Sequence, residues 1–415
     1  MTVTDTPTVA HALETPGEGR VASHLHPEGS FDVAAHPVPT GREEIWRFTP
    51  LKRLRGLHTD DSVTPLGSAT TSVEVQAAPG VTVRTVPADD SARGSSGYVP
   101  TDRVTARAWA AVSGATVVTV PSEAVIADAT LVTHRGTTTD TASADHLVIV
   151  AEPHSKATVV LTFEGSAVLA DVVEIVVGVG AQLTVVSVQD WADDAVHYST
   201  QHARVGRDGS LRHVAVSFGG DLVRMNASVD YDGPGGQAEL LGLYFADAGQ
   251  HLEHRLFVDH NAPRTRSNVD YKGALQGQGA HAVWIGDVLI RQVAEGIETY
   301  ESNRNLVLTD GCQADSVPNL EIETGEIEGA GHASTTGRFD DQQLFYLQSR
   351  GIPEDEARRL VVHGFFADII RRIGVPAIEE RLLSTLEAEL EKNVGTPRLV
   401  DPLLDPAAVE AEGRA

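Results

Sequence analysis

Short runs of β-branched and other apolar residues, separated by Gly, Pro and Asp, fill the chain from about residue 70 to about residue 335. Examples are VTVRTVP, HLVIVAEP, KATVVLTFEGSA, AELLGLYFA and AHAVWIGDVLI. Such runs are typical of β-strands that end in turns, and helical spacing is almost absent from this region. The runs recur about every 20 to 25 residues without a strict sequence repeat, which predicts a β-solenoid or a large β-sandwich.

Near residue 340 the apolar positions change to helical spacing. FDDQQLFYLQSRG places Leu344, Phe345 and Leu347 on one helix face. A second helix is predicted for IPEDEARRLVVHGFFADIIRRIG, which has Pro353 and acidic residues near its start and two arginines near its end. Acidic residues at the start and basic residues at the end of a helix interact favourably with the helix dipole. PAIEERLLSTLEAELEKNVG predicts a third helix. We therefore expect a helical domain at the C-terminal side of the β region.

The two ends of the chain differ from this central pattern. The first residues are rich in Pro, Thr, Gly and His and show little periodicity, so we expect them to be largely disordered. GREEIWRFTPLKRLRGL has an aromatic and basic pattern that suits docking on a core, with Trp46 and Phe48 as the anchors. The predicted divisions are a disordered tail, an N-terminal helical docking segment, a β core, a C-terminal helical domain and a second tail: 1–40, 41–70, 71–338, 339–396 and 397–415.

The charge balance narrows the classes of partner. The 415 residues include 32 Lys and Arg against 58 Asp and Glu, a formal net charge of −26. This excess of acid argues against non-specific binding to nucleic acid or to an anionic membrane surface, because both need basic patches. No apolar run reaches the roughly 18 residues that span a bilayer, and MTVTDTPTVAHALETPGEGR lacks the basic and apolar regions of a secretion signal. We expect a cytoplasmic protein.

Motifs of several enzyme classes are absent from the sequence. It contains no phosphate-binding G-x-x-x-x-G-K-[ST], no G-x-S-x-G and no H-E-x-x-H. HLEH holds His251 and His254, but strand geometry would point the two side chains to opposite faces, so we interpret both as ordinary surface histidines rather than as a metal pair. The single cysteine, Cys312, precedes His332 by twenty positions. A cysteine–histidine hydrolase and a buried structural thiol both remain open from the residues alone.

Several stretches share their residues and their order with one known family. EEIWRFTPLKRL is similar to an E-x-W-x-x-T-P-L segment, and VDHNAPRTRSNVDYKGALQGQGAHAVWIGDVLI contains His-x-x-Pro, YKG and G-D-V-L-I elements. RNLVLTDGCQADSVPNLEIETGEIEGAGHASTTGRFDDQQLFYLQSRGI and EARRLVVHGFFADIIRRI follow. Together these stretches fall between residues 42 and 395 and resemble the SufB/SufD family, the paired scaffold proteins of iron–sulfur cluster assembly.

The resemblance implies a fold and a set of partners. The fold would be mainly β, a right-handed parallel β-helix core with an N-terminal helical segment and a C-terminal helical domain. In the family, a SufB-type and a SufD-type protein pair through their β-helices, and each binds a SufC-type ATPase through its helical domain. The complex receives sulfur, acquires iron and builds a nascent cluster. The chain would then be a non-catalytic scaffold subunit, and ATP hydrolysis would belong to its partner.

Three features favour the SufD type within this resemblance. The chain is short for a SufB type, it lacks an N-terminal cysteine motif, and Ala333 stands where SufB members have Glu. His332 falls where SufD members carry the histidine thought to face the SufB cysteine. Cys312, however, sits where SufB members carry their own interface cysteine, so a SufB-like role or a functional homodimer stays open.

His332 and Cys312 are therefore the candidate iron or cluster ligands at an interface shared with a partner chain. Thiolates hold iron–sulfur clusters, in some cases together with imidazole. One Cys and one His cannot enclose a cluster, so further ligands would come from the partner. An imidazole within reach would lower the pKa of the thiol and favour the thiolate. The alternative is that Cys312 is a buried apolar group and His332 a structural histidine.

The predicted C-terminal helices carry the candidate contacts for the ATPase, because an amphipathic helix suits docking in a groove. The candidate side chains are Phe345, Leu360, Phe365 and Phe366. Gly364 lies inside the second helix at a cost of about 1 kcal/mol relative to Ala, which suggests close packing or a contact surface.

Two questions stay open at this point. The resemblance raises a reduced flavin as an iron-reducing partner of the complex, but the sequence has no flavin motif, and the type of cluster is not defined either. A carbohydrate-active β-helix enzyme is the alternative of another class. The absence of a secretion signal, an aromatic content of 5% and the predicted helical domain count against that enzyme.

Overall fold

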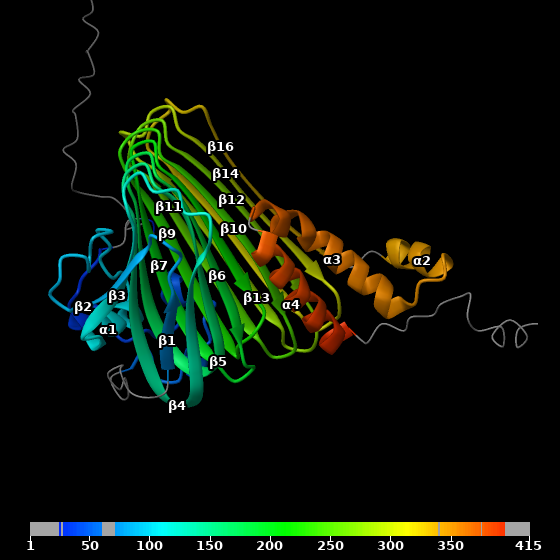
Figure 1. Cartoon of the computed structure of the whole chain (residues 1–415). Helices are drawn as coiled ribbons and strands as arrows, with labels where there is room; N and C mark the ends of the chain where they lie inside the picture. The colour runs from blue at the N-terminus through cyan, green and yellow to red at the C-terminus, as the bar shows by residue number, and fades with distance from the viewer. Residues whose placement is uncertain (1–24, 26–27, 60–70, 339–340, 375, 395–415) are drawn as a thin grey trace, which may run out of the picture.

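The computed structural model describes residues 25, 28–59, 71–338, 341–374 and 376–394 (Figure 1). The C-terminal tail predicted over 397–415, most of the N-terminal tail predicted over 1–40, and positions 60–70 of the predicted docking segment lie outside the described residues.

A parallel β-solenoid forms the body of the molecule, as predicted, and it has two sheets that face each other (Figure 1). Two strands of 22 residues, β4 (Thr130–Ala151) and β5 (Lys156–Val177), each run through both sheets. β5 pairs with β6 along its first part and with β7 along its second part, and from there the strands alternate between the sheets.

Every pairing from β4 onward along the solenoid is parallel, and the register is regular except for a shift between Thr137 and Ala142 where β4 pairs with β5. The even-numbered sheet consists of β6 (Gln182–Trp191), β8 (Ser210–Ser217), β10 (Gln237–Ala246), β12 (Arg266–Leu275), β14 (Glu298–Val307) and β16 (Gly329–Arg338). The odd-numbered sheet consists of β7 (Val196–Gly206), β9 (Leu222–Asp232), β11 (His251–His260), β13 (His281–Ile290) and β15 (Gln313–Ile322).

The repeat length differs from the prediction. Gln182 pairs with Ser210 and Gln237 with Arg266, so equivalent residues of successive solenoid turns are 28 and 29 positions apart. Each such turn contains two strands. The expected interval of about 20 to 25 residues is therefore wrong, because several apolar runs joined the end of one strand to the next strand across a tight turn.

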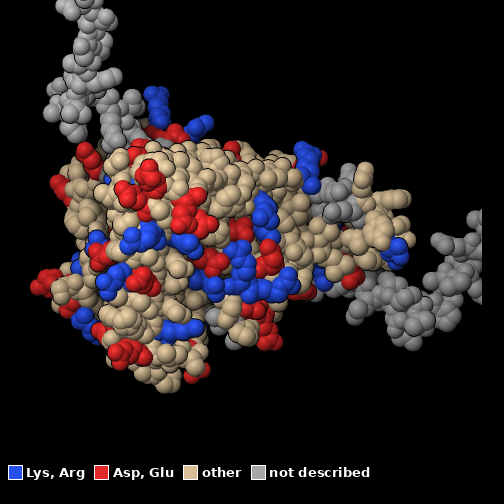
Figure 2. Space-filling model, turned by 90° about the horizontal axis from the view of Figure 1, so that it is seen from above, with Lys and Arg blue, Asp and Glu red and all other residues tan. Residues whose placement is uncertain are grey.

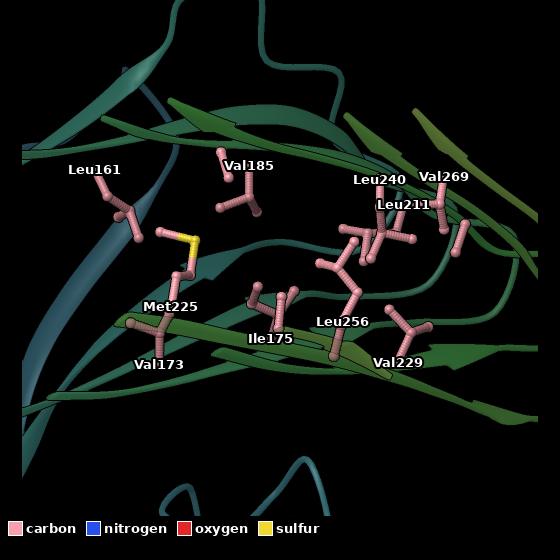
Figure 3. Close-up of a cluster of buried hydrophobic side chains, with 14 of the residues drawn as sticks. Leu161, Val173, Ile175, Val185, Leu211, Met225, Val229, Leu240, Leu256 and Val269 are labelled. Atoms are coloured by element: carbon pink, nitrogen blue, oxygen red, sulfur yellow. The ribbon is translucent and has the colours of Figure 1, made fainter. Parts of the chain in front are cut away.

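Alternate residues of each strand point into the space between the sheets and form the main core. Figure 3 shows these side chains meeting from the two sides. On one side are residues from the first part of β5 and from the even strands: Leu161, Val185, Leu211, Leu240 and Val269. On the other side are residues from the second part of β5 and from β9 and β11: Val173, Ile175, Met225, Val229 and Leu256.

Two glycines within this core make room for two tyrosines. Gly242 of β10 is in register with Tyr271 of β12, and Tyr244 of β10 is in register with Gly273 of β12. A Cβ atom at Gly242 would lie 2.0 Å from the Tyr271 ring, and one at Gly273 would lie 1.9 Å from the Tyr244 ring. Tyr271 and Gly273 are the outer residues of the YKG element, so this element is a packing motif between two solenoid turns.

The N-terminal segment covers the outer face of the odd-numbered sheet. Trp46 is buried, stacks on Tyr198 with ring centroids 5.9 Å apart, and lies 4.4 Å from the Arg224 guanidinium. Arg224 also donates a 2.8 Å hydrogen bond to the Ile45 carbonyl. Trp46 thus anchors the segment as expected, whereas Phe48 is only half-buried.

The remaining N-terminal elements are short. Three are single 3-10 turns: η1 (Val33–Ala35), η2 (Glu44–Trp46) and η3 (Leu51–Leu54). The helix α1 (Arg103–Ala111) packs on β4 and β5. The strands that precede β4 are β1 (Thr71–Gln76), β2 (Thr82–Pro87) and β3 (Gly114–Val120).

Helices cover the outer face of the even-numbered sheet (Figure 1). The predicted helices are present as α2 (Asp341–Ser349), α3 (Glu354–Arg372) and α4 (Pro376–Val394). Apolar residues of α3 and α4 pack on β8, β10 and neighbouring strands. Arg372 ends α3 and donates hydrogen bonds to Asp270 at 2.6 Å and Glu239 at 2.9 Å, which fixes the helix end to the sheet. In Figure 1, α2 extends away from the solenoid. None of the described helices has the length and apolar character needed to cross a membrane.

The Gly–Tyr packing generates a stability prediction. Gly273→Ala should lower the free energy of unfolding by at least about 2 kcal/mol, because the added methyl group overlaps the Tyr244 ring inside a packed core. Urea denaturation of the purified chain, followed by circular dichroism, measures this change.

Gly364→Ala is the matched control. An added Cβ at Gly364 meets no described atom within 4 Å, so the substitution should raise the free energy of unfolding by up to about 1 kcal/mol. If Gly273→Ala were as stable as the wild type, the interpretation of YKG as a packing motif would be wrong.

Candidate functional site

The C-terminal end of the solenoid is open. Within the described part of the chain, β15 pairs only with β13, and β16 pairs only with β14. Their residues are half-buried or exposed, in contrast to the buried strands of earlier turns. Each of these two strands therefore has one free backbone edge.

His332 lies in the first half of β16, in register with Glu301 of β14. Side chains in register on neighbouring parallel strands point to the same side of the sheet, so His332 belongs to the inward-facing row. Ser334, two residues after His332 on the same strand, donates a 2.7 Å hydrogen bond across the interior to Ser316 of β15. No further solenoid turn covers His332 in the described chain, and its side chain is exposed.

Cys312 lies in the turn before β15 and is half-buried. Its thiol donates to the Gly277 carbonyl at 3.4 Å and packs against the edge of the main core. Asp310 in the same turn pairs at 2.8 Å with Arg338, which ends β16. Arg338 is six residues beyond His332, a separation of about 20 Å along a strand. The structure thus places Cys312 and His332 at different positions along the open end and does not bring them together.

A buried carboxyl group, Glu301, is in register with His332 and was not among the residues predicted from the sequence. Glu301 is 1% exposed, and neither of its carboxyl oxygens has a hydrogen-bond partner among the described residues. Burial, and to a smaller degree the nearby Asp287 carboxylate, raises the pKa of Glu301 to about 8. The glycine at position 286 leaves room for this group, because a Cβ there would lie 2.8 Å from Glu301 Oε1.

Glu301 and His332 are one solenoid turn apart, at 31 positions in the sequence. This separation could have linked Glu301 to His332 in the sequence, but only if the number of residues in one solenoid turn had been known. No group of three or more His, Cys, Asp or Glu side chains in the described ranges is arranged to hold a metal ion. A metal at this end would need donors from another chain or from water.

HLEH follows strand geometry, but its histidines are not ordinary surface residues. His254 points inward and lies 3.0 Å from the Ser217 hydroxyl, and burial lowers its pKa to about 3. His251 points outward and its Nδ1 lies 3.1 Å from Nδ1 of His281. Both HLEH histidines are 1% exposed: His254 is enclosed between the two sheets, and the N-terminal segment covers His251 on the outer face.

The four candidate partner-binding residues have different environments. Phe345 in α2 is 72% exposed and Leu360 in α3 is 49% exposed. Phe365 is half-buried beneath Lys272, whose ammonium group lies 5.2 Å from the ring. Phe366 is fully buried between α3 and the sheet, so its side chain is not available to a partner in this conformation. The space around Gly364 is open, so close packing within the chain does not explain this glycine.

The surface charge is mixed rather than segregated on the face that Figure 2 presents, where Lys and Arg side chains lie among Asp and Glu. Ion pairs that join the helices to the sheet contribute to this pattern. Lys272 of β12 pairs with Asp368 of α3, and Arg372 of α3 pairs with Glu239 of β10 at 2.9 Å.

Comparison with known proteins gives a consistent result. The family model for "SUF system FeS cluster assembly, SufBD core domain" matches residues 132–365, which run from β4 into α3. An iron–sulfur cluster assembly SufBD family protein of Mycobacterium bovis is 56% identical over 375 residues, which cover 89% of this chain and 94% of that protein.

Two further relatives are also iron–sulfur cluster assembly proteins. A SufBD family protein of Mycobacterium leprae is 54% identical over 367 residues, 87% of this chain and 93% of that protein. The iron–sulfur cluster assembly protein SufD of Bacillus subtilis is 27% identical over 297 residues, 70% of this chain and 67% of that protein.

The buried carboxyl group predicts a pH dependence of stability. The pKa of Glu301 is about 8 in the folded chain against an ordinary value of 4.5, so between these values the folded state keeps a proton that the unfolded state has lost. The contribution of Glu301 to stability should therefore decrease as the pH rises through this window, by at most about 1.4 kcal/mol per pH unit. Glu301→Gln should remove this decrease.

Urea denaturation at pH 5.5 and pH 7.5 tests the prediction, with Glu298→Gln, an exposed residue of the same strand, as the control. The gain in stability of Glu301→Gln over the wild type should be larger at the higher pH, while Glu298→Gln should follow the wild type at both. Equal pH slopes for Glu301→Gln and the wild type would contradict a buried, unpartnered carboxyl group.

Proposed function

The chain belongs to the SufBD family of iron–sulfur cluster assembly proteins, and from this premise we propose that it is a SufD-type scaffold subunit. It would pair with a SufB-type protein through its solenoid and with a SufC-type ATPase through its C-terminal helices. The relative of Bacillus subtilis named SufD supports the type, as does Ala333 in place of the Glu of SufB members. The chain would catalyse no reaction alone.

The single observation that carries this proposal is the open end of the solenoid. β15 and β16 each present a free edge, and such edges pair readily with strands of another chain. A SufB-type solenoid could continue both sheets across the interface. A second copy of this chain could do the same, which makes a homodimer the expected state when no SufB-type partner is present.

The open end also presents an iron ligand. An exposed imidazole suits iron(II), the cargo of the assembly reaction, and His332 would hold it together with donors of the partner. Cys312 is half-buried and about 20 Å along the strand direction from the level of His332, so we assign the main role to His332 and a secondary one to Cys312. The cluster would be transient and shared between chains. No flavin site is proposed on this chain.

The ATPase would dock on the outward side of the helical domain. Phe345 and Tyr346 of α2 are 72% and 57% exposed, and Leu360 of α3 is 49% exposed. An exposed group of large apolar side chains on a projecting helix is typical of a protein contact. Meanwhile α3 and α4 are anchored to the even-numbered sheet, so force from a moving ATPase would reach the solenoid directly.

Coexpression with a SufB-type and a SufC-type partner tests the role of His332. His332→Ala should leave assembly of the complex intact and lower iron bound after reconstitution several-fold, because an exposed ligand is removed without loss of packing. Cys312→Ala should have a smaller effect. Iron and acid-labile sulfide per complex are the measurements.

His154→Asn, an exposed turn histidine at a positive φ that Asn tolerates, is the control for loss of an imidazole. If His332→Ala keeps the wild-type iron content, His332 is structural. If neither partner copurifies with the wild-type chain, the SufD-type proposal itself fails, and a homodimeric scaffold of the same family becomes the next candidate.

The docking proposal predicts a separate effect at α2. Phe345→Asp should reduce copurification of the SufC-type ATPase at least tenfold, because a charge replaces an exposed apolar contact, and it should leave the melting temperature unchanged. Val125→Asp, at a 74% exposed position on the solenoid, is the control and should retain the ATPase. Equal retention in the two variants would exclude α2 from the contact.

A further inference from the structure

Two histidines meet on the outer face of the odd-numbered sheet. His251 begins β11 and His281 begins β13, and the two residues are in register. Their Nδ1 atoms are 3.1 Å apart, with ring planes at 70° and ring centroids 4.8 Å apart. His281 is in register with Gln313, which follows Cys312 at the start of β15, whereas His332 lies on β16 of the other sheet, so this pair is separate from the proposed iron ligand His332.

The other nitrogen of each ring faces a carboxylate. Nε2 of His281 lies 2.7 Å from Oδ2 of Asp315, and Nε2 of His251 lies 3.2 Å from Oε2 of Glu253. Glu253 also accepts hydrogen bonds from the Thr49 hydroxyl and the Arg255 guanidinium, so donors surround it and it acts as an acceptor. Both carboxylates therefore call for an N–H on the histidine that faces them.

Counting ring protons shows that this arrangement is incomplete. Two neutral imidazoles carry two N–H groups, one per ring. If each N–H points to its carboxylate, both Nδ1 atoms present lone pairs to each other at 3.1 Å. The contact then needs either a third proton or a metal ion between the two nitrogens.

The geometry points to a metal site: we propose that Nδ1 of His251 and Nδ1 of His281 bind one divalent transition-metal ion of the zinc or iron(II) class. Zinc–nitrogen bonds of about 2.0–2.1 Å at a tetrahedral angle place two ligand nitrogens about 3.3 Å apart, close to the observed separation. Metal-bound histidines typically donate their second N–H to a carboxylate, which orients the ring and increases its basicity. Asp315 and Glu253 stand in those positions.

The charges around the pair are compatible with a cation. Three arginines approach from neighbouring elements and pair with two carboxylates: Arg53 with Asp221, and both Arg224 and Arg255 with Glu253. Asp315 has no arginine partner at the pair; its Oδ2 accepts from His281 and from the Gln313 amide.

Water or another chain must complete the coordination, because the described residues offer the metal only two nitrogen ligands here. Access is available from one side: the His281 side chain is 22% exposed and the Asp315 side chain is 28% exposed. A site with two fixed ligands and open positions suits reversible binding of a metal rather than a permanent structural role.

Cobalt(II) titration of the full chain without a histidine tag tests the proposal, followed by visible absorption. We expect one equivalent with a ligand-field spectrum, and competition by zinc. His281→Gln should weaken binding at least tenfold, and Asp315→Asn should weaken it about tenfold through loss of ring orientation. His154→Asn should bind like the wild type.

A second readout separates lost binding from lost folding. Excess zinc should raise the melting temperature of the wild type and of His154→Asn but not of His281→Gln, while circular dichroism of all three metal-free proteins stays the same. A wild-type chain that takes up no cobalt(II) at this pair overturns the proposal, since a third proton then fills the contact. Unchanged cobalt(II) affinity in His281→Gln overturns it equally. Neither result depends on partner pairing or on His332.

Discussion

The parallel backbone ladder between successive solenoid turns is the constraint from which most other features of this protein follow. Each strand aligns residue by residue with the strand of the next solenoid turn, so a side chain is always stacked on an equivalent side chain some thirty positions away. Because the register is fixed, a side chain cannot move away from a stacked residue that is too large to fit beside it. Tyr271 therefore requires Gly242, and Tyr244 requires Gly273, although each pair is distant in sequence. The same ladder places His251 against His281 and Glu301 beside His332.

The ladder also explains why polar residues gather inside the last solenoid turns. Tyr244 donates to Asn305 at 2.6 Å, Asn305 donates to Asn303 at 2.8 Å, and Ser316 donates to the same Asn303 oxygen at 2.8 Å. A buried amide or hydroxyl is tolerated because side chains of the same strand, of the facing sheet or of a strand two turns away offer a partner. Glu301 differs from these groups, since no described residue completes its hydrogen bonds; the Tyr271 hydroxyl and Trp284 Nε1 are also without a partner among the described residues. A carboxyl group that remains buried without compensation, directly beneath an exposed imidazole, is a cost to stability that the fold alone does not explain.

The sequence was sufficient for the strands, the C-terminal helices and the family, because these depend on local patterns. Charge order at the ends of α3 and β-branched runs in the core are properties of neighbouring residues. Features that depend on the ladder could not be predicted without the length of a solenoid turn. Glu301 was missed for this reason, and His251 was expected at the surface although the docked N-terminal segment buries it. Phe366 and Phe365 are adjacent on one helix, and only the packing of α3 on the sheet shows which of them is enclosed.

The surfaces of the solenoid that its own N-terminal segment and helices leave exposed determine where this protein can bind other proteins. The N-terminal segment occupies one outer face of the solenoid, and α3 and α4 occupy the other. The edges of β15 and β16 and the projecting α2 are the remaining prominent contacts among the described elements. The inward row at the open end is polar, with Ser334 bonded to Ser316 and Thr336 accepting from Asn305 at 3.4 Å, so water can meet it without exposing the apolar core. This polar end of the solenoid is stable both when a partner covers it and when water contacts it. Such an end favours an interface that opens and closes, whereas an apolar end would favour permanent association.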